Sequence, residues 1–214
     1  MKEIFYDWGG ANIWLFYAIN GWHNDVLDSV MQIGTALGDH RWFPVYLTVL
    51  AIVAWWRVAR GAEPLRWLGV LAVFCTAYVL DGVLIDWLKH GLNFPRPPAA
   101  LAPDTVHLVG TPEYKYSFPS GHAMFATTCA TSLWPLLGRE GRLAAVALVL
   151  WVAWSRISLG VHFPADVIAG ALLAIAIVLG IRWALDVLAA RALAAEHPPR
   201  AHSPRKPASR RHRR

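Results

Sequence analysis

Five long apolar segments constrain this chain more than any other feature of its sequence. An α-helix needs ~17–25 apolar residues to cross the hydrocarbon core of a bilayer, and the segments are near this length, the third being the shortest. Tryptophans cluster towards the segment ends, as is typical of side chains that prefer the membrane–water interface. The pattern predicts an all-α, polytopic transmembrane helical bundle with about five spanning helices, at residues 42–59, 67–88, 123–137, 143–159 and 167–188.

The composition supports an integral membrane protein and excludes two other classes. Hydrophobic residues make up 56% of the 214 residues and charged residues 16%, whereas ordinary soluble domains carry about 25% charged residues. A chain this apolar would collapse, which excludes a disordered protein. Cys75 and Cys129 both lie inside apolar segments, so a disulfide-stapled secreted scaffold is excluded as well.

Residues 1–41 are predicted to form an N-terminal interfacial amphipathic segment. Glu3 and Asp7 appear early, and no basic start leads into an unbroken apolar stretch, so a cleavable signal peptide is not indicated. Within residues 24–37, apolar residues recur at near-helical spacing opposite Asp25 and Asp28, which predicts a helix too short and too polar to cross ~30 Å of hydrocarbon. We expect it to lie along the membrane surface, where it could also pack as a collar on the bundle.

The positive charge of the chain is concentrated at its C-terminus. Residues 197–214 carry seven Lys or Arg residues and no acid, so the formal charge of +6 becomes −1 once this stretch is set aside. Residues 192–214 are therefore predicted to be a disordered basic cytoplasmic tail, and nucleic acid is not expected as a partner. The tail could bind anionic lipid head groups, or it could act only as a topology signal.

The charged connections predict how the bundle is oriented in a cell (inner) membrane. Three Arg-containing stretches fall on one side of a five-span arrangement, and the positive-inside tendency makes that side cytoplasmic: residues 57–66, residues 139–142 and the tail. The opposite, periplasmic or extracytoplasmic side then holds residues 1–41, 89–118 and 155–166.

Polar residues whose side chains could take part in catalysis or binding occur in three stretches on that outer side. They predict a phosphate-binding site there. Lys89, Arg96 and Arg156 supply cations, and arginine offers a planar fork that matches phosphate oxygens. Ser120 and Gly121 follow a proline at a predicted helix start, where backbone N–H groups and the positive end of the helix dipole attract anions.

Two histidines make this predicted site a candidate catalyst. Asp166 follows His162 by four residues, with Pro164 well placed to begin a helix. A carboxylate bonded to one ring nitrogen leaves the other nitrogen free to act as a nucleophile. His122, at the other helix start, could protonate a leaving oxygen. No metal-ligand motif is apparent, so neither a metal nor a cofactor is expected.

Together the three stretches resemble the signature of the type-2 phosphatidic acid phosphatase superfamily. That signature is written Lys-x6-Arg-Pro, Pro-Ser-Gly-His and Ser-Arg-x5-His-x3-Asp. The present sequence matches every position, with Lys89 to Arg96-Pro97, Pro119-Ser120-Gly121-His122, and Ser155-Arg156 to His162 to Asp166. The resemblance extends over roughly residues 42–188.

The resemblance implies that residues 42–191 form a transmembrane phosphatase domain. It implies metal-independent hydrolysis of a lipid-linked phosphomonoester or pyrophosphate at the outer face through a phosphohistidine intermediate. His162 would be the nucleophile, Asp166 its orienting partner and His122 the general acid. The phosphate would be bound by the remaining motif residues: Lys89, Arg96, Ser120, Gly121 and Arg156.

Several alternatives stay open at this stage. Taken alone, Lys89 and Arg96 could anchor a helix end at the head groups, and Asp166 could be an ordinary first-turn acid. Asp81 and Asp86 lie within a predicted span, where we favour a structural or supporting role in which Asp86 pairs with Lys89 or His90.

The type of activity and the substrate also stay open. A lipid phosphotransferase would use the same residues, whereas a transporter or scaffold is less consistent with polar groups at one end of the bundle. Undecaprenyl pyrophosphate, phosphatidylglycerophosphate, phosphatidate and lipid A are all compatible substrates. The oligomeric state is not indicated.

Overall fold

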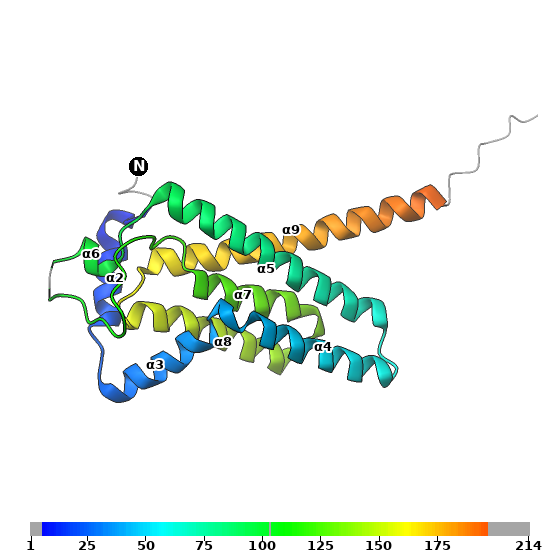
Figure 1. Ribbon diagram of the computed structural model, residues 1–214, viewed down its shortest axis with the longest axis horizontal. Helices are drawn as coiled ribbons and strands as arrows, with labels where there is room; N and C mark the ends of the chain where they lie inside the picture. The colour runs from blue at the N-terminus through cyan, green and yellow to red at the C-terminus, as the bar shows by residue number, and fades with distance from the viewer. Residues whose placement is uncertain (1–5, 103, 197–214) are drawn as a thin grey trace, which may run out of the picture. The chain divides into compact units, whose positions relative to one another are not determined.

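The computed structural model describes residues 6–102 and 104–196, and these described residues contain helices and loops but no strand. The chain divides into two compact units, Met1–Arg182 and Trp183–Arg214. The predicted basic tail lies mostly outside the described residues, except that residues 192–196 are helical rather than disordered. The longer elements are α2 (Ala11–Asn20), α3 (Asp25–Leu37), α4 (Phe43–Ala59), α5 (Pro64–Leu92), α7 (Gly121–Leu133), α8 (Arg139–Ser158) and α9 (Pro164–Glu196) (Figure 1).

Within residues 6–102 and 104–196, four helical stretches are long and apolar enough to cross a membrane, which supports the predicted polytopic bundle. They are His40–Ala59, Pro64–Ala100, Arg139–Ser158 and Pro164–Ala195. The first of these joins a short 3-10 helix η2 (His40–Trp42) to α4, and the second includes the single-turn helix α6 (Pro97–Ala100).

The predicted third span, residues 123–137, differs from the other four. It forms α7, which has 13 residues, and then a 3-10 turn, η3 (Trp134–Leu136), that contains Pro135. Most α7 side chains are buried within the protein, and the helix packs on both α5 and α8. Its apolar sequence therefore reflects burial in the protein core. A helix that is surrounded by protein is apolar on all sides, and so is a helix that faces lipid.

The predicted amphipathic helix forms α3 and packs along α8 as a collar. Asn24 caps it, accepting a hydrogen bond of 2.9 Å from the Leu27 amide. Glycines bring the two helices close together, since a Cβ on Gly38 would lie 2.5 Å from Val152 Cγ1. A second apolar row of α3 stays exposed, namely Val26, Val30, Ile33 and Leu37. Its placement along the membrane surface remains a prediction.

The helix ends that carry the signature residues lie at one end of the first unit. Figure 1 shows α5 ending there and α7 and α9 beginning there, next to α2 and α6. Pro164 is the first residue of α9, as predicted, and Ser120 is the N-cap of α7 after a cis Phe118–Pro119 peptide. The Ser120 amide donates a hydrogen bond of 3.0 Å to the Asp166 carbonyl, which joins the two helix starts.

The long loop before α7 is held by the N-terminal helices. Asn20 donates to the carbonyl of His107 at 2.7 Å and accepts from the His107 amide at 2.9 Å. The His107 ring lies 2.8 Å from the carboxylate of Asp28, so part of the polar face of α3 contacts this loop. The loop region that carries Arg96 and Ser120 is thereby fixed to the bundle.

Candidate active site

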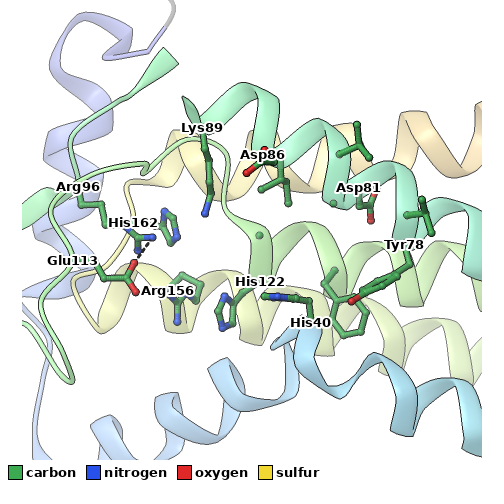
Figure 2. Close-up of a pocket in the computed structure, with 16 residues that line it drawn as sticks. His40, Tyr78, Asp81, Asp86, Lys89, Arg96, Glu113, His122, Arg156 and His162 are labelled. Atoms are coloured by element: carbon green, nitrogen blue, oxygen red, sulfur yellow. Dashed lines mark ion pairs between the residues drawn. The ribbon is translucent and has the colours of Figure 1, made fainter. Parts of the chain in front are cut away.

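A cavity of about 660 Å³ opens among these helix ends. Figure 2 shows side chains entering it from α5, from the loop before α7, from the start of α7, from α8 and from the turn between α8 and α9. Six of the eight residues predicted for the site line this cavity: Lys89, Arg96, Gly121, His122, Arg156 and His162. The other two, Ser120 and Asp166, are fully buried beside it.

His162 is buried and held by Asp166. The distance from His162 Nδ1 to Asp166 Oδ2 is 3.2 Å, and neither side chain is exposed by more than 2%. Because Nδ1 is engaged by the carboxylate, Nε2 is the ring nitrogen left for chemistry at the cavity that His162 lines. This is the arrangement that the four-residue spacing predicts.

Asp166 is itself fixed by three donors other than His162. Tyr6 Oη donates to Oδ1 at 2.7 Å, while Ser117 Oγ and the Phe163 amide donate to Oδ2 at 2.5 Å and 2.9 Å. The Tyr6 ring stacks on Phe94 at a centroid distance of 4.4 Å, which positions its hydroxyl group. A carboxylate held at both oxygens keeps the imidazole in one orientation and one tautomer.

Arg96 is oriented by the backbone and carries a carboxylate at its tip. Its Nε donates to the Lys115 carbonyl at 3.0 Å, and its Nη1 donates to the Val161 carbonyl at 3.3 Å. Nη2 lies 2.5 Å from Glu113 Oε2, and the Glu113 side chain is 62% exposed (Figure 2). Glu113 therefore occupies an N–H group of Arg96 that could otherwise donate a hydrogen bond to a phosphate oxygen.

Arg156 and Lys89 complete the positive charge of the cavity. Arg156 Nη1 donates to Thr35 Oγ1 of α3, and its Nε is buried without a hydrogen-bond partner among the described residues. Lys89 extends from α5 towards the same space (Figure 2). The three cations thus come from separate elements and converge at His162. Together they can bind a phosphate group next to its ring.

The start of α7 supplies further donors. Gly121 is the first residue of the helix, where backbone N–H groups have no helical acceptor. Ser120 Oγ is buried and makes no hydrogen bond within the described part of the chain. A buried hydroxyl group without a partner at an anion-attracting helix start is suited to a phosphate oxygen.

Both histidines of the site are neutral in the free protein. Burial, together with Arg156 and His162, lowers the pKa of His122 to about 2. Burial and the surrounding cations Arg96 and Arg156 also hold the pKa of His162 well below its usual value. A neutral imidazole is the nucleophilic form, whereas a general acid must carry a proton, so His122 needs an additional negative charge nearby in order to act as one.

The two aspartates of α5 have different surroundings. Asp86 is exposed and lies 3.2 Å from His90 Nδ1, one of the two partners predicted for it. Asp81 is buried, accepts from Thr128 Oγ1 at 2.5 Å and lines the cavity. No group of three or more His, Cys, Asp or Glu side chains close enough to hold a metal ion occurs among the described residues.

Several residues of the site are not indicated by sequence motifs. Tyr6 and Thr35 act on the site from positions 160 and 121 residues away from their partners, so no local spacing could reveal them. Glu113 lies in a loop without a recognisable pattern. Ser117 was detectable in principle, because it lies two residues before the Pro-Ser-Gly-His stretch.

Comparison with known proteins identifies the family. A model of the PAP2 superfamily matches residues 70–189. The chain is 29% identical over 157 residues to a lipid A 1-phosphatase of Rhizobium johnstonii, covering 65% of this chain and 60% of that protein. It is 30% identical over 165 residues to an undecaprenyl-diphosphatase of Sulfolobus acidocaldarius, covering 77% and 73%.

A solved structure is similar as well. The crystal structure of Aquifex aeolicus LpxE matches with a TM-score of 0.65 and 28% identity, and the match covers 79% of this chain and 93% of that one. The family match covers more than half of the chain and contains all the residues that converge on the cavity from α5 to α9. The chain therefore belongs to the PAP2 superfamily of membrane lipid phosphatases.

Proposed function

We propose that this protein hydrolyses a lipid-linked phosphomonoester or pyrophosphate through a phosphohistidine formed on His162. One observation carries the proposal: Nδ1 of His162 is bonded to Asp166, while the ring lines a cavity with Lys89, Arg96 and Arg156 around it. This combination presents a neutral, oriented nucleophile to a group of cations that can bind three phosphoryl oxygens.

In the first step, His162 Nε2 attacks phosphorus, and the bond from phosphorus to the lipid oxygen breaks. His122 donates its proton to that leaving oxygen, while Lys89, Arg96 and Arg156 stabilise the charge on the equatorial oxygens. In the second step a water molecule attacks the phosphohistidine, and the neutral His122 accepts a proton from it. Inorganic phosphate then leaves, His162 is neutral again, and His122 releases to solvent the proton that it took up on substrate binding.

The substrate itself would enable His122 to act as the acid. The pKa of His122 is low in the free protein because burial and Arg156 disfavour the imidazolium form. A phosphate dianion beside the ring reverses that balance, since an opposite charge at close range favours the protonated form. Proton uptake and substrate binding would therefore be coupled.

The same cations make the reaction independent of divalent metal ions. Three side-chain cations and the start of α7 can compensate the phosphoryl charge in the way that Mg²⁺ does in other phosphoryl transfer enzymes. We expect full activity in EDTA, and a strict requirement for a divalent ion would contradict this role of Lys89, Arg96 and Arg156.

We place the active site on the extracytoplasmic face of the membrane. The support is the distribution of charge, since the signature residues lie at the opposite end of α5 from the Arg-rich residues 57–66. Labelling of cells with a membrane-impermeant thiol reagent tests the orientation, using Tyr114→Cys on the site side and Glu63→Cys on the other. Labelling of only the Glu63→Cys variant from outside would refute it.

Rapid quenching with a ³²P-labelled lipid phosphate tests the nucleophile. Wild-type protein should form an acid-labile, base-stable phosphoprotein, and His162→Ala should form none. His90→Ala is a matched control, because His90 is exposed, does not line the cavity, and contacts Asp86 and the Tyr116 ring. Removing a nucleophile abolishes turnover almost completely, so residual activity above about 1% in His162→Ala would contradict the assignment.

A further inference from the structure

The cavity is larger than a phosphate group requires. Its volume of about 660 Å³ would hold roughly twenty water molecules at ~30 Å³ each. From the phosphate-binding end it continues along α5, where its walls are Val79, Val83, Ile85 and Phe125. Val79 and Val83 are also 60% and 65% exposed on the outer surface of the helix, so this part of the cavity borders the lipid-facing side. It is therefore suited to the apolar part of a lipid.

A buried carboxylate lies among these apolar walls. Asp81 is 5% exposed and lines the cavity, and its Oδ2 accepts the Thr128 hydroxyl at 2.5 Å. Its Oδ1 is buried and has no hydrogen-bond partner among the described residues. A buried carboxyl oxygen without a donor is costly, and in a native protein it calls for a partner that the protein itself does not supply.

Two other buried aspartates of the same chain, Asp166 and Asp39, show how protein donors satisfy a buried carboxylate. Both oxygens of Asp166 accept hydrogen bonds, from Tyr6 on one side and from Ser117 on the other. Both oxygens of Asp39 accept from Arg41. Asp7 and Asp28 also have one buried oxygen without a hydrogen-bond partner among the described residues, but neither of them lines the cavity. Asp81 differs because its oxygen without a donor belongs to a residue of the cavity wall.

We infer that Asp81, positioned by Thr128, is a subsite that accepts a hydrogen bond from a hydroxyl or amide N–H group of the lipid. Asp81 precedes Lys89 by eight residues on α5, which places it about 12 Å along the helix from the phosphate-binding end. Figure 2 shows both side chains extending from α5. This inference rests on the proposed function and narrows its substrate class.

The favoured substrates are acylated lipid phosphates that carry a hydroxyl or amide donor in the acyl region, close to the head group. A plain polyprenyl chain has no donor to offer, so binding it would leave Asp81 Oδ1 unsatisfied. A site built to bond a polar group discriminates strongly against analogues that lack it, because its own buried group is then left unpaired.

A matched pair of substrates tests the subsite. Phosphate release is measured for two synthetic phosphatidates that differ only in a 3-hydroxyl group on the acyl chains. We expect the wild-type kcat/KM to favour the hydroxylated lipid about tenfold. Asp81→Leu should reduce this preference to about one, and Asp81→Asn should retain most of it, because the amide keeps an acceptor oxygen. Asp25→Leu, the same type of change at an exposed aspartate of α3 that does not line the cavity, should keep the preference.

A binding measurement separates this inference from the proposed chemistry. The thermal stabilisation of the purified protein is compared for the two corresponding diacylglycerols, which have no phosphate to hydrolyse. The hydroxylated lipid should stabilise the wild type more than the plain one, and Asp81→Leu should lose the difference. Equal stabilisation of the wild type by both lipids would overturn the subsite even if phosphate is released. A difference without phosphate release would support the subsite and refute the proposed hydrolysis.

Discussion

Gly170→Ala tests whether close packing between α9 and the start of α7 sets the geometry of the site. A Cβ at Gly170 would lie 2.5 Å from the Ser120 carbonyl oxygen and 3.3 Å from the Met124 amide nitrogen. Both neighbours are backbone atoms, so no side-chain rotation can relieve the clash. Ordinary contact begins near 3.4 Å, which requires the first turn of α7 to move by about 0.9 Å.

This displacement acts on the residues that we place around the phosphate. Ser120 and Gly121 would shift together with the adjacent His122, away from His162. Misplacement by about 1 Å can cost about 10²-fold in rate, so we expect kcat for phosphate release to fall by about that factor. Overpacking costs about 1–3 kcal/mol, which in a protein of this size should lower Tm by roughly 2–8 °C after the small gain from replacing a helical glycine.

Gly180→Ala is the matched control on the same helix. A Cβ at Gly180 would meet no atom within 4 Å, so the same substitution adds a methyl group to open space. We expect activity equal to that of the wild type and an unchanged or slightly higher Tm, because alanine is favoured over glycine in a helix by roughly 0.5–1 kcal/mol. Wild-type kcat in Gly170→Ala, or an equal loss in both variants, would refute the reasoning.

Three further properties of the cavity can be tested with the same purified protein: the protonation of His122, the ion pair of Glu113 and the hydrogen bond of Tyr6. Phosphate binding at pH 7 should take up about one proton, because the anion favours the protonated form of His122, whose pKa burial and Arg156 lower to about 2 in the free protein. Calorimetry in two buffers of different ionisation enthalpy measures this uptake, and equal heats would contradict it. Glu113→Gln should tighten inhibition by inorganic phosphate by up to about fivefold, because an exposed ion pair is worth ~0.2–1 kcal/mol; an unchanged inhibition constant would show that Glu113 does not compete. Tyr6→Phe removes a donor to Asp166 worth about 1.5 kcal/mol and should lower kcat about tenfold, whereas an unchanged kcat would mean that the remaining donors suffice.

The sequence predicts the four long apolar helices more accurately than it predicts α7, the helix inside the bundle. Segment length and apolar content correctly indicate α4, α5, α8 and α9, because spanning a bilayer imposes both features. The same criteria treat residues 123–137 as a fifth span, although α7 is shorter and mostly buried in protein. Lipid and a protein core are both apolar, so composition alone does not tell which of them surrounds a helix.

The spacing of the signature residues determines the local parts of the site. His162 and Asp166 lie four residues apart, and Pro164 begins α9 between them, so their contact is set within one turn of chain. Ser120 occupies the N-cap position of α7 for an equally local reason, since it directly precedes the first helical residue.

Tertiary structure alone decides which distant side chains complete that arrangement. The hydroxyl of Tyr6 on Asp166, the hydroxyl of Thr35 on Arg156 and the carboxylate of Glu113 on Arg96 all depend on how helices and loops pack. A periodic sequence pattern shows which face of a helix is apolar and where the helix ends. It does not show which other element will pack against that face. The sequence thus determines a membrane-embedded helical protein that carries the signature motifs of its family, and only the folded bundle determines the shape and the polar walls of the cavity that these residues line.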